Sequence, residues 1–373
     1  MEKTLKDIAQ ELRNIDKKVQ LIYAFNGVGK TRLSREFKQL ISSAKNEPAE
    51  KEDTAENALK VLYYNAFTED LFYWDNDLEN DIDRKIKIQP NSFTYWILHD
   101  EGQEDEIAKL FSHYTGSKLT PEFRNNYSEV SFYIPTGDDS VRENIKISNS
   151  ENSNFIWCVF YAMLELVIEA LNTSAENRST DSFNHLEYIF IDDPVTSLDE
   201  NHLVELAVDL AQLIKESKSS LKFIITTHNP LFYNVLCNEF KKQKRWRLVK
   251  FEDGTYDLIP QDNDAPFAYH ISLLSELKQA IDSGTLKKYH FAFLRNILEK
   301  TAIFLGYANW KDVLDDNNKA VLGRLIDISS HSHYSGMEVL SLTEENKSAI
   351  KSLFDSIVKQ FNFKLPNNMQ DGA

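Results

Sequence analysis

Short apolar runs alternate along the first two thirds of the chain with longer stretches in which apolar residues recur every three or four positions. The runs at residues 19–23, 188–191 and 221–227 predict strands, and the periodic stretches at 33–41 and 203–213 predict amphipathic helices. Every residue of the 188–191 run is β-branched or aromatic, which is typical of a strand buried on both faces. Strands and helices in this order indicate an α/β fold.

Further elements are predicted in the same part of the chain. Apolar spacing favours helices at residues 3–14, 105–114 and 155–171, and apolar runs favour strands at 59–64 and 130–134. The 155–171 segment is the longest apolar run, but glutamates interrupt it. We therefore expect a buried helix there and not a membrane span.

The pattern becomes helical from about Pro266 onward. Apolar positions recur at three- and four-residue spacing in residues 271–283 and 286–305. We therefore expect two domains, an α/β domain at residues 1–262 and a mostly α-helical domain at 263–373.

Composition and charge limit the classes of function. The chain has 373 residues, enough for two domains with a real core. The formal charge of −16 disfavours a protein that coats nucleic acid or anionic membrane along its whole surface, so a polyanionic partner would need a local basic patch. Cys158 and Cys237 show no metal-ligand spacing, and we expect buried thiols in a reducing compartment. With no apolar signal core at the N-terminus, a cytoplasmic protein is expected.

The first strand runs directly into a phosphate-loop pattern, Ala24-Phe25-Asn26-Gly27-Val28-Gly29-Lys30-Thr31. Strand, glycine-containing loop and helix in this order are the context that the pattern requires. The glycines let backbone N–H groups curl around a β-phosphate, Lys30 reaches the β- and γ-phosphates, and the Thr31 hydroxyl ligates Mg²⁺. ATP or GTP, which the motif does not distinguish, is predicted to bind through Asn26, Gly27, Val28, Gly29, Lys30 and Thr31.

Two carboxylates, Asp192 and Asp193, follow the 188–191 strand at its C-terminal end, where open α/β sheets place their ligand chemistry. A buried carboxylate is costly unless a cation meets it, and a nucleotide-bound Mg²⁺ is the usual partner. Asp192 is therefore predicted to hold the nucleotide's Mg²⁺ together with Thr31. The alternative is a capped turn without chemistry. His228 ends the next predicted strand and is either structural or a sensor of the γ-phosphate.

Two weaker motifs flank the 188–191 strand. Ser148 lies in Ile147-Ser148-Asn149-Ser150-Glu151, just ahead of the long apolar helix, and taken alone it is best explained as a helix cap. Asp199 ends the segment Ser197-Leu198-Asp199 a few residues after Asp193.

Together these pieces resemble the ABC-type ATPase heads of the RecF and SMC kind, over about the first 250 residues. The resemblance implies that Asp193 replaces the glutamate that polarises the attacking water, and that His228 senses the γ-phosphate. Because Asp193 is one methylene shorter, hydrolysis is expected to be slow or to use an intervening water. The resemblance also implies a homodimer of heads, possibly a higher oligomer, in which Ser148 and Asp199 complete composite nucleotide sites.

The stretch at residues 241–250, Lys-Lys-Gln-Lys-Arg-Trp-Arg-Leu-Val-Lys, stands out in so acidic a chain. Arg245 and Arg247 alternate with apolar residues, and a turn precedes residues 255–259, so a hairpin is predicted. Two explanations stay open. The stretch is either a solvated edge strand protected by lysines or a contact for an RNA backbone.

The helical domain contains Arg295 and Glu299 at i and i+4, on one face of a predicted helix. Spacing alone explains the pair equally well as an intrahelical salt bridge. A histidine follows later, in Ser330-His331-Ser332. Arginine, glutamate and histidine can form a metal-free ribonuclease site. One group takes the proton of a ribose 2′-OH, another protonates the leaving 5′-oxygen, and the arginine stabilises the transition-state charge.

With these motifs the chain resembles the PrrC-type anticodon nucleases over nearly its whole length. The resemblance implies an antiphage toxin in which Arg295, Glu299 and His331 cleave a tRNA anticodon loop, leaving 2′,3′-cyclic phosphate and 5′-OH ends. It also implies latency, imposed by a type I DNA restriction complex. His333 is a second imidazole close to His331, and the identity of the tRNA stays open.

Two other functions compete with this hypothesis. The chain could be an ABC-type ATPase subunit of a defence or DNA-repair complex, with a C-terminal domain that only binds a partner. Arg295 and Glu299 would then be a plain salt bridge. A DNA-end-processing ATPase is a third possibility, but the acidic charge and the absence of sustained heptads count against it.

Overall fold

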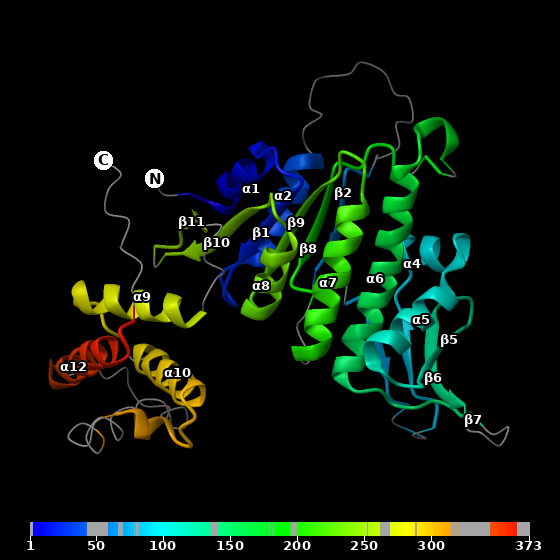
Figure 1. Ribbon diagram of the computed structural model, residues 1–373. Helices are drawn as coiled ribbons and strands as arrows, with labels where there is room; N and C mark the ends of the chain where they lie inside the picture. The colour runs from blue at the N-terminus through cyan, green and yellow to red at the C-terminus, as the bar shows by residue number, and fades with distance from the viewer. Residues whose placement is uncertain are drawn as a thin grey trace. The chain divides into compact units, whose positions relative to one another are not determined.

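The computed structural model (Figure 1) divides into two compact units, Met1–Pro266 and Phe267–Ala373, and each is described by itself. The structure describes residues 3–42, 59–65, 70–77, 79, 82–135, 141–178, 180–181, 183–194, 200–251, 253–261, 269–287, 289–314, 319 and 344–363.

A six-stranded sheet in the order β11-β10-β1-β9-β8-β2 forms the centre of the first unit. Its pairings are parallel except for the antiparallel pair β10–β11. All five residues of β8 are buried, which confirms the strand buried on both faces. The strands are β1 (Val19–Tyr23), β2 (Val61–Tyr64), β8 (Tyr188–Asp192), β9 (Lys222–Thr227), β10 (Lys244–Lys250) and β11 (Tyr256–Pro260).

Helices cover both faces of this sheet. On one face, α1 (Leu5–Asn14) and α2 (Lys30–Ser42) share an apolar cluster with strand residues such as Phe190. On the other lie α7 (Glu200–Glu216) and α8 (Pro230–Glu239) (Figure 1). The predicted α/β fold with a strand, phosphate-loop pattern and helix in succession is confirmed in this unit.

The long apolar helix is α6 (Asn149–Asn172). By length and composition it could cross a membrane, but 78% of its apolar window is buried inside the protein. Trp157 and Phe160 pack against Tyr64 of β2, with ring centroids 5.4 and 4.9 Å apart. The burial is that of a core helix, as the sequence predicts.

A second sheet was largely missed by sequence reasoning, which predicted only one helix and one strand between residues 70 and 144. Its main path has the order β3-β4-β6-β5, and all of its pairings are antiparallel. The strands are β3 (Phe72–Asp75), β4 (Lys85–Ile88), β5 (Thr120–Arg124), β6 (Glu129–Pro135) and β7 (Val141–Arg142), and the helices beside them are α4 (Ser92–Tyr95), the π-helical turn Trp96–Asp100 and α5 (Glu104–Thr115). Phe111, Phe132 and Phe155 join this sheet to α5 and α6.

The basic hairpin forms as predicted, but neither explanation of it holds for every residue. β10 pairs with β1 as well as β11, so it is an interior strand and not an edge. Arg245 is buried and donates from Nη2 to the Cys237 carbonyl at 2.7 Å, so it does not face solvent where RNA could reach it. Cys237, like Cys158, is a buried free thiol.

The second unit is helical in the part that the structure describes, as expected. Its elements are α9 (Tyr269–Asp282), α10 (Tyr289–Phe304), the 3₁₀ turn Trp310–Val313 and α12 (Glu344–Phe361). Leucine, isoleucine and phenylalanine side chains from the three α-helices form one buried cluster that includes Leu277, Leu298 and Phe354.

Phe190 supports the cluster between the sheet and the α1–α2 pair, so its truncation is expected to destabilise the first unit. The side chain is fully buried and lies 5.7 Å from the ring of Phe37. Phe190→Ala should lower the free energy of unfolding by about 3–5 kcal/mol. Urea unfolding followed by circular dichroism measures the change. Phe251→Ala is the matched control, because that ring is 48% exposed, and a similar loss there would contradict the assignment of the core.

Candidate functional site

The phosphate-loop segment connects β1 to α2 and depends on two glycines in left-handed backbone conformation. Gly27 has φ of 80° and Gly29 has φ of 109°, values that other residues adopt only with strain. The Ala24 N–H donates to the Thr227 carbonyl at 3.0 Å, which fixes the start of the loop against β9. Helix α2 begins at Lys30, so its first N–H groups lie next to the loop, where an anion would be stabilised.

Lys30 is almost fully buried, with 7% of its side chain exposed. Its Nζ lies 3.4 Å from the Ala24 carbonyl and 3.1 Å from Oδ1 of Asn26, both in the loop. A third oxygen, Oδ2 of Asp193, lies 3.3 Å away. The ammonium group is therefore held directly over the loop that the sequence predicts to carry phosphates.

Asp192 is buried at the end of β8 and accepts hydrogen bonds on both oxygens. Thr31 Oγ1 donates to Oδ2 at 2.6 Å, and Thr226 Oγ1 donates to Oδ1. Burial outweighs these bonds and raises the pKa of Asp192. The predicted pair of magnesium ligands, Thr31 and Asp192, is thus in direct contact.

The donor set fits Mg²⁺, because a carboxylate and a hydroxyl are hard oxygen ligands and the buried carboxylate gains from a cation. The described residues contain no group of three or more His, Cys, Asp or Glu side chains that could hold a metal ion by themselves. Thr31 and Asp192 are the described residues that would hold such an ion. When bound, it would neutralise phosphate charge at this end of β8.

Asp193 adopts a left-handed conformation with φ of 54°. Its Oδ2 lies 2.6 Å from Nδ1 of His228 and 3.3 Å from Nζ of Lys30, and its Oδ1 accepts from Thr227 Oγ1 at 3.2 Å. Burial opposes the charged form, but the contacts with His228 and Lys30 prevail and lower the pKa of Asp193. The two residues predicted to act in nucleotide hydrolysis, Asp193 and His228, are thus directly paired.

Two site residues escaped the sequence analysis. Thr226 and Thr227 end β9, and their hydroxyls donate to Asp192 and Asp193, respectively. A signal was present in the sequence, because the two threonines directly precede His228 at the end of the strand predicted at residues 221–227. Asn229 then caps α8, with Pro230 in its first turn, which holds His228 at the junction of strand and helix.

Ser148 caps α6 with a full capping box. Its side chain accepts from the Glu151 N–H at 3.2 Å, and Glu151 accepts from the Ser148 N–H at 2.7 Å. This is the local role that its spacing indicates, and the contact across a dimer stays a prediction. Asp199 lies outside the described residues.

In the second unit, α10 brings Arg295 and Glu299 together. Arg295 Nε donates to Glu299 Oε1 at 2.7 Å, and the two side chains are 27% and 38% exposed. His331 and His333 lie outside the described residues. His290, which the sequence analysis did not consider, is buried near the start of α10, where Nδ1 accepts from the Lys287 N–H at 2.8 Å. Burial lowers the pKa of His290, which suits a structural role.

Fold and site together define an α/β protein with a phosphate-loop motif and a helical second unit. Comparison with known sequences identifies its family. The chain is 47% identical to the anticodon nuclease of Escherichia coli over 388 aligned residues, which cover 97% of this chain and 98% of the relative. The chain therefore belongs to the anticodon nuclease family, as the resemblance predicted. No protein-family model matches it.

Solved structures give only weak similarities. The SMC head domain of Pyrococcus furiosus aligns with a TM-score of 0.29 at 12% identity, over 50% of this chain and 40% of that chain. A structure of RNase-L Inhibitor aligns with a TM-score of 0.31 at 13% identity, over 65% of this chain and 34% of that chain. The chain thus spans less than half of each of these two structures, and the scores are too low to add to the fold described above.

Replacing Asp192 or Asp193 by asparagine is expected to change the stability of the nucleotide-free protein in opposite directions. Asp192→Asn removes a charge whose burial is costly, so the thermal midpoint at neutral pH should rise by about 2–4 °C. Asp193→Asn removes the charge that Lys30 and His228 neutralise, so the midpoint should fall. Scanning calorimetry on both variants measures the shifts.

The pH dependence of these shifts separates the two causes. Because the pKa of Asp192 is raised, the gain from Asp192→Asn should fade as the pH falls through that raised value and the wild-type carboxyl becomes neutral. The pKa of Asp193 is lowered, so its contribution is present above the unfolded value and is lost as the pH falls through the folded value. Shifts of the same sign in both variants would contradict these charge assignments.

Proposed function

We propose that this protein is an endoribonuclease that cleaves a tRNA within its anticodon loop. The observation that carries the proposal is the 47% identity to an anticodon nuclease over 97% of the chain, because a match of that extent includes both units. The ion pair of Arg295 and Glu299 on α10 supports it, since an arginine next to a carboxylate suits general acid–base chemistry at a phosphodiester.

The reaction we propose needs no water and leaves cyclic ends. The ribose 2′-oxygen attacks the adjacent phosphorus, a base takes the 2′ proton, and the bond from phosphorus to the 5′-oxygen breaks as an acid protonates that oxygen. The products are a 2′,3′-cyclic phosphate and a 5′-OH. Of Glu299 and His331, one takes the 2′ proton as the base and the other protonates the 5′-oxygen as the acid. Arg295 stabilises the charge that develops on the phosphoryl oxygens.

The first unit would act as a nucleotide-dependent regulator. Lys30 and the loop from Asn26 to Thr31 would bind the phosphates of ATP or GTP, and Thr31 with Asp192 would hold Mg²⁺. The buried position of Lys30 and the direct contact between Thr31 and Asp192 support this role. Asp193 and His228 would act at the γ-phosphate, with the slow hydrolysis expected of the shorter carboxylate.

Assembly and biological setting follow from the family resemblance and are part of the proposal. Two phosphate-loop units would pair head to head, and Ser148 and Asp199 of one subunit would complete the nucleotide site of the other. The nuclease would act in the cytoplasm as an antiphage toxin, kept latent by a type I restriction complex.

Lys30→Ala is expected to abolish nucleotide binding, because the Lys30 ammonium hydrogen bonds to Ala24 and Asn26 within the phosphate loop. The thermal stabilisation that Mg–ATP or Mg–GTP gives the wild type should disappear with it. Isothermal titration calorimetry measures the affinity directly. Lys38→Ala is the control, because Lys38 lies on the same helix but packs over the ring of Tyr63. Unchanged nucleotide affinity in Lys30→Ala would refute the phosphate-loop assignment.

A second function has one observation in its favour. The contact between Arg295 and Glu299 is also the geometry of an ordinary i, i+4 salt bridge, such as Lys278–Asp282 on α9 at 2.9 Å. In that case the helical unit would only bind a partner, and the protein would be the ATPase subunit of a defence or repair complex.

A charge swap separates the two functions. The double variant Arg295→Glu, Glu299→Arg restores an ion pair but places neither group where a reacting phosphate needs it. We expect tRNA cleavage to fall by at least about a hundredfold, the range of a lost acid or base. Mapping of 5′-OH ends in total tRNA measures cleavage, and His331→Ala should show a similar loss.

The matched control is the swap Lys278→Glu, Asp282→Lys, which exchanges the charges of the salt bridge on α9 and should keep full cleavage. Wild-type cleavage in the Arg295/Glu299 swap would reduce that pair to a structural salt bridge. If the wild type cleaves no tRNA with any nucleotide, the nuclease proposal itself fails.

A further inference from the structure

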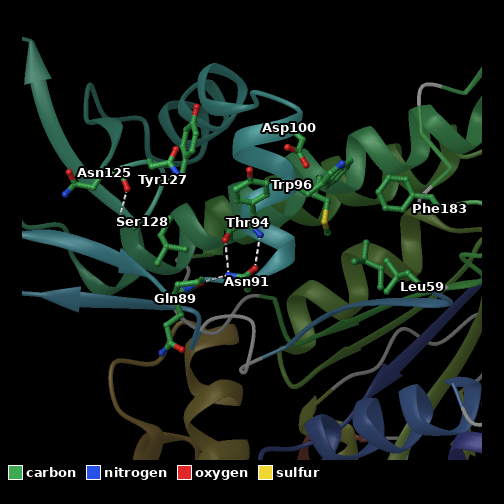
Figure 2. Close-up of a pocket in the computed structure, with 16 residues that line it drawn as sticks. Leu59, Gln89, Asn91, Thr94, Trp96, Asp100, Asn125, Tyr127, Ser128 and Phe183 are labelled. Atoms are coloured by element: carbon green, nitrogen blue, oxygen red, sulfur yellow. Dashed lines mark hydrogen bonds between the residues drawn. The ribbon is translucent and has the colours of Figure 1, made fainter. Parts of the chain in front are cut away.

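A cavity of about 900 Å³ lies in the first unit, between the antiparallel sheet and the central sheet (Figure 2). It is separate from the phosphate loop. Leu59 and Leu62, at the amino-terminal end of β2, line it, whereas Asn65, beyond the other end of β2, donates to Ser34 of the phosphate-loop helix. Six residues of extended chain span about 20 Å, so the cavity and the nucleotide site lie at opposite ends of the strand.

Aromatic rings form much of the cavity wall and hold one another in place. Trp96 packs edge-on against Phe183, with ring centroids 5.0 Å apart. Tyr95 stacks on His99 at 4.5 Å, and His99 meets Tyr127 edge-on at 6.2 Å. Rings that are fixed in this way offer preformed flat surfaces, which favour a planar ligand over a flexible one.

One end of the cavity is built on the turn that connects β5 to β6. Asn125, Asn126 and Tyr127 are consecutive residues with φ of 50°, 54° and 62°, in the left-handed region that tight hairpin turns require and that asparagine adopts readily. Local bonds maintain it: Ser128 Oγ donates to the Asn125 carbonyl at 2.8 Å, and the Tyr127 hydroxyl donates to Glu104. These bonds fix the backbone of the turn that connects β5 to β6.

The chemistry of the lining differs between the two ends. Phe183 and Leu59 lie at the apolar end in Figure 2, and Asn125 and Tyr127 lie at the polar end. The Tyr127 hydroxyl and the Asn125 amide nitrogen already donate to Glu104 and Glu129. The amide oxygen of Asn125 and the amide of Asn126 are therefore left to match the heteroatoms on the edge of a base. Asp100 is the one charged side chain among the described residues of the lining, and none of them is a lysine or arginine. A phosphate group inside the cavity is therefore disfavoured.

We propose that this cavity binds a nucleoside, with the uncharged base between the aromatic rings and its polar edge toward Asn125 and Asn126. The volume is within the range of small-molecule sites and exceeds what one base needs. The nucleoside can come from two sources, a free metabolite or a base turned out of an RNA strand. The inference goes beyond the proposed nuclease and nucleotide functions, because it concerns a separate site.

Binding of adenosine, guanosine, cytidine and uridine to the full chain tests the proposal. Equilibrium dialysis is done in the Lys30→Ala background, so that the phosphate loop does not contribute. At least one nucleoside should bind, and Tyr95→Ala should weaken it about tenfold through the lost ring contact. Tyr73→Ala is the matched control, because Tyr73 is 49% exposed, as Tyr95 is at 50%, but does not line the cavity.

A second arm identifies the source. A short unstructured oligoribonucleotide of the preferred base is added as competitor to an Arg295→Ala, Lys30→Ala variant. If the oligoribonucleotide displaces the nucleoside and Tyr95→Ala weakens this displacement, the natural ligand is a base in an RNA strand. If the oligoribonucleotide does not displace the nucleoside, the natural ligand is a free nucleoside. The proposal is overturned if no nucleoside binds, if Tyr95→Ala binds as tightly as its parent, or if only an aliphatic carboxylate such as octanoate binds. None of these readouts depends on tRNA cleavage, so the nuclease proposal is tested independently.

Discussion

Two adjacent carboxylates at the end of a buried strand are the constraint on which the first unit depends. Each would be costly in these surroundings without partners. The two carboxylates are stabilised in two different ways. Asp192 stays in the extended strand between the hydroxyls of Thr31 and Thr226, whereas Asp193 turns out of the strand and contacts Lys30 and His228. The parallel order β1-β9-β8 makes both arrangements possible, because it brings three strand ends to one edge of the sheet.

Local sequence was sufficient for the parts of this site whose chemistry is local. The glycines of the phosphate loop require left-handed backbone, and both have it. Buried parallel strands are continuous apolar runs, so β1, β8 and β9 could be recognised within a residue or two of their ends. The contact between Thr31 and Asp192, 161 positions apart, was predictable only because the strand–loop–helix motif has a known geometry.

Features that depend on distant pairing could not be predicted in this way. Strands β3 to β6 are short and contain many polar residues, and their register is set by pairing with one another. The cavity beside them joins residues from 59 to 183, which no local pattern connects. Arg245 is a further example. Its charge predicted a side chain exposed to solvent, but β10 is paired on both sides, and Arg245 is buried with its guanidinium against the Cys237 carbonyl. Conversely, Arg295 and Glu299 were predictable because one helix turn fixes them.

The short side chain of Asp193 has a physical consequence for the proposed regulation. A γ-phosphate drawn to Lys30 brings negative charge to the ammonium that the Asp193 carboxylate contacts at 3.3 Å. Two anions compete for one buried cation, so nucleotide binding is expected to weaken the Lys30–Asp193 pair. His228 Nδ1 lies 2.6 Å from the same carboxylate and is its second charge partner. If the proposed regulation holds, Asp193 would register bound nucleotide by exchanging partners, and it would do so even when hydrolysis is slow.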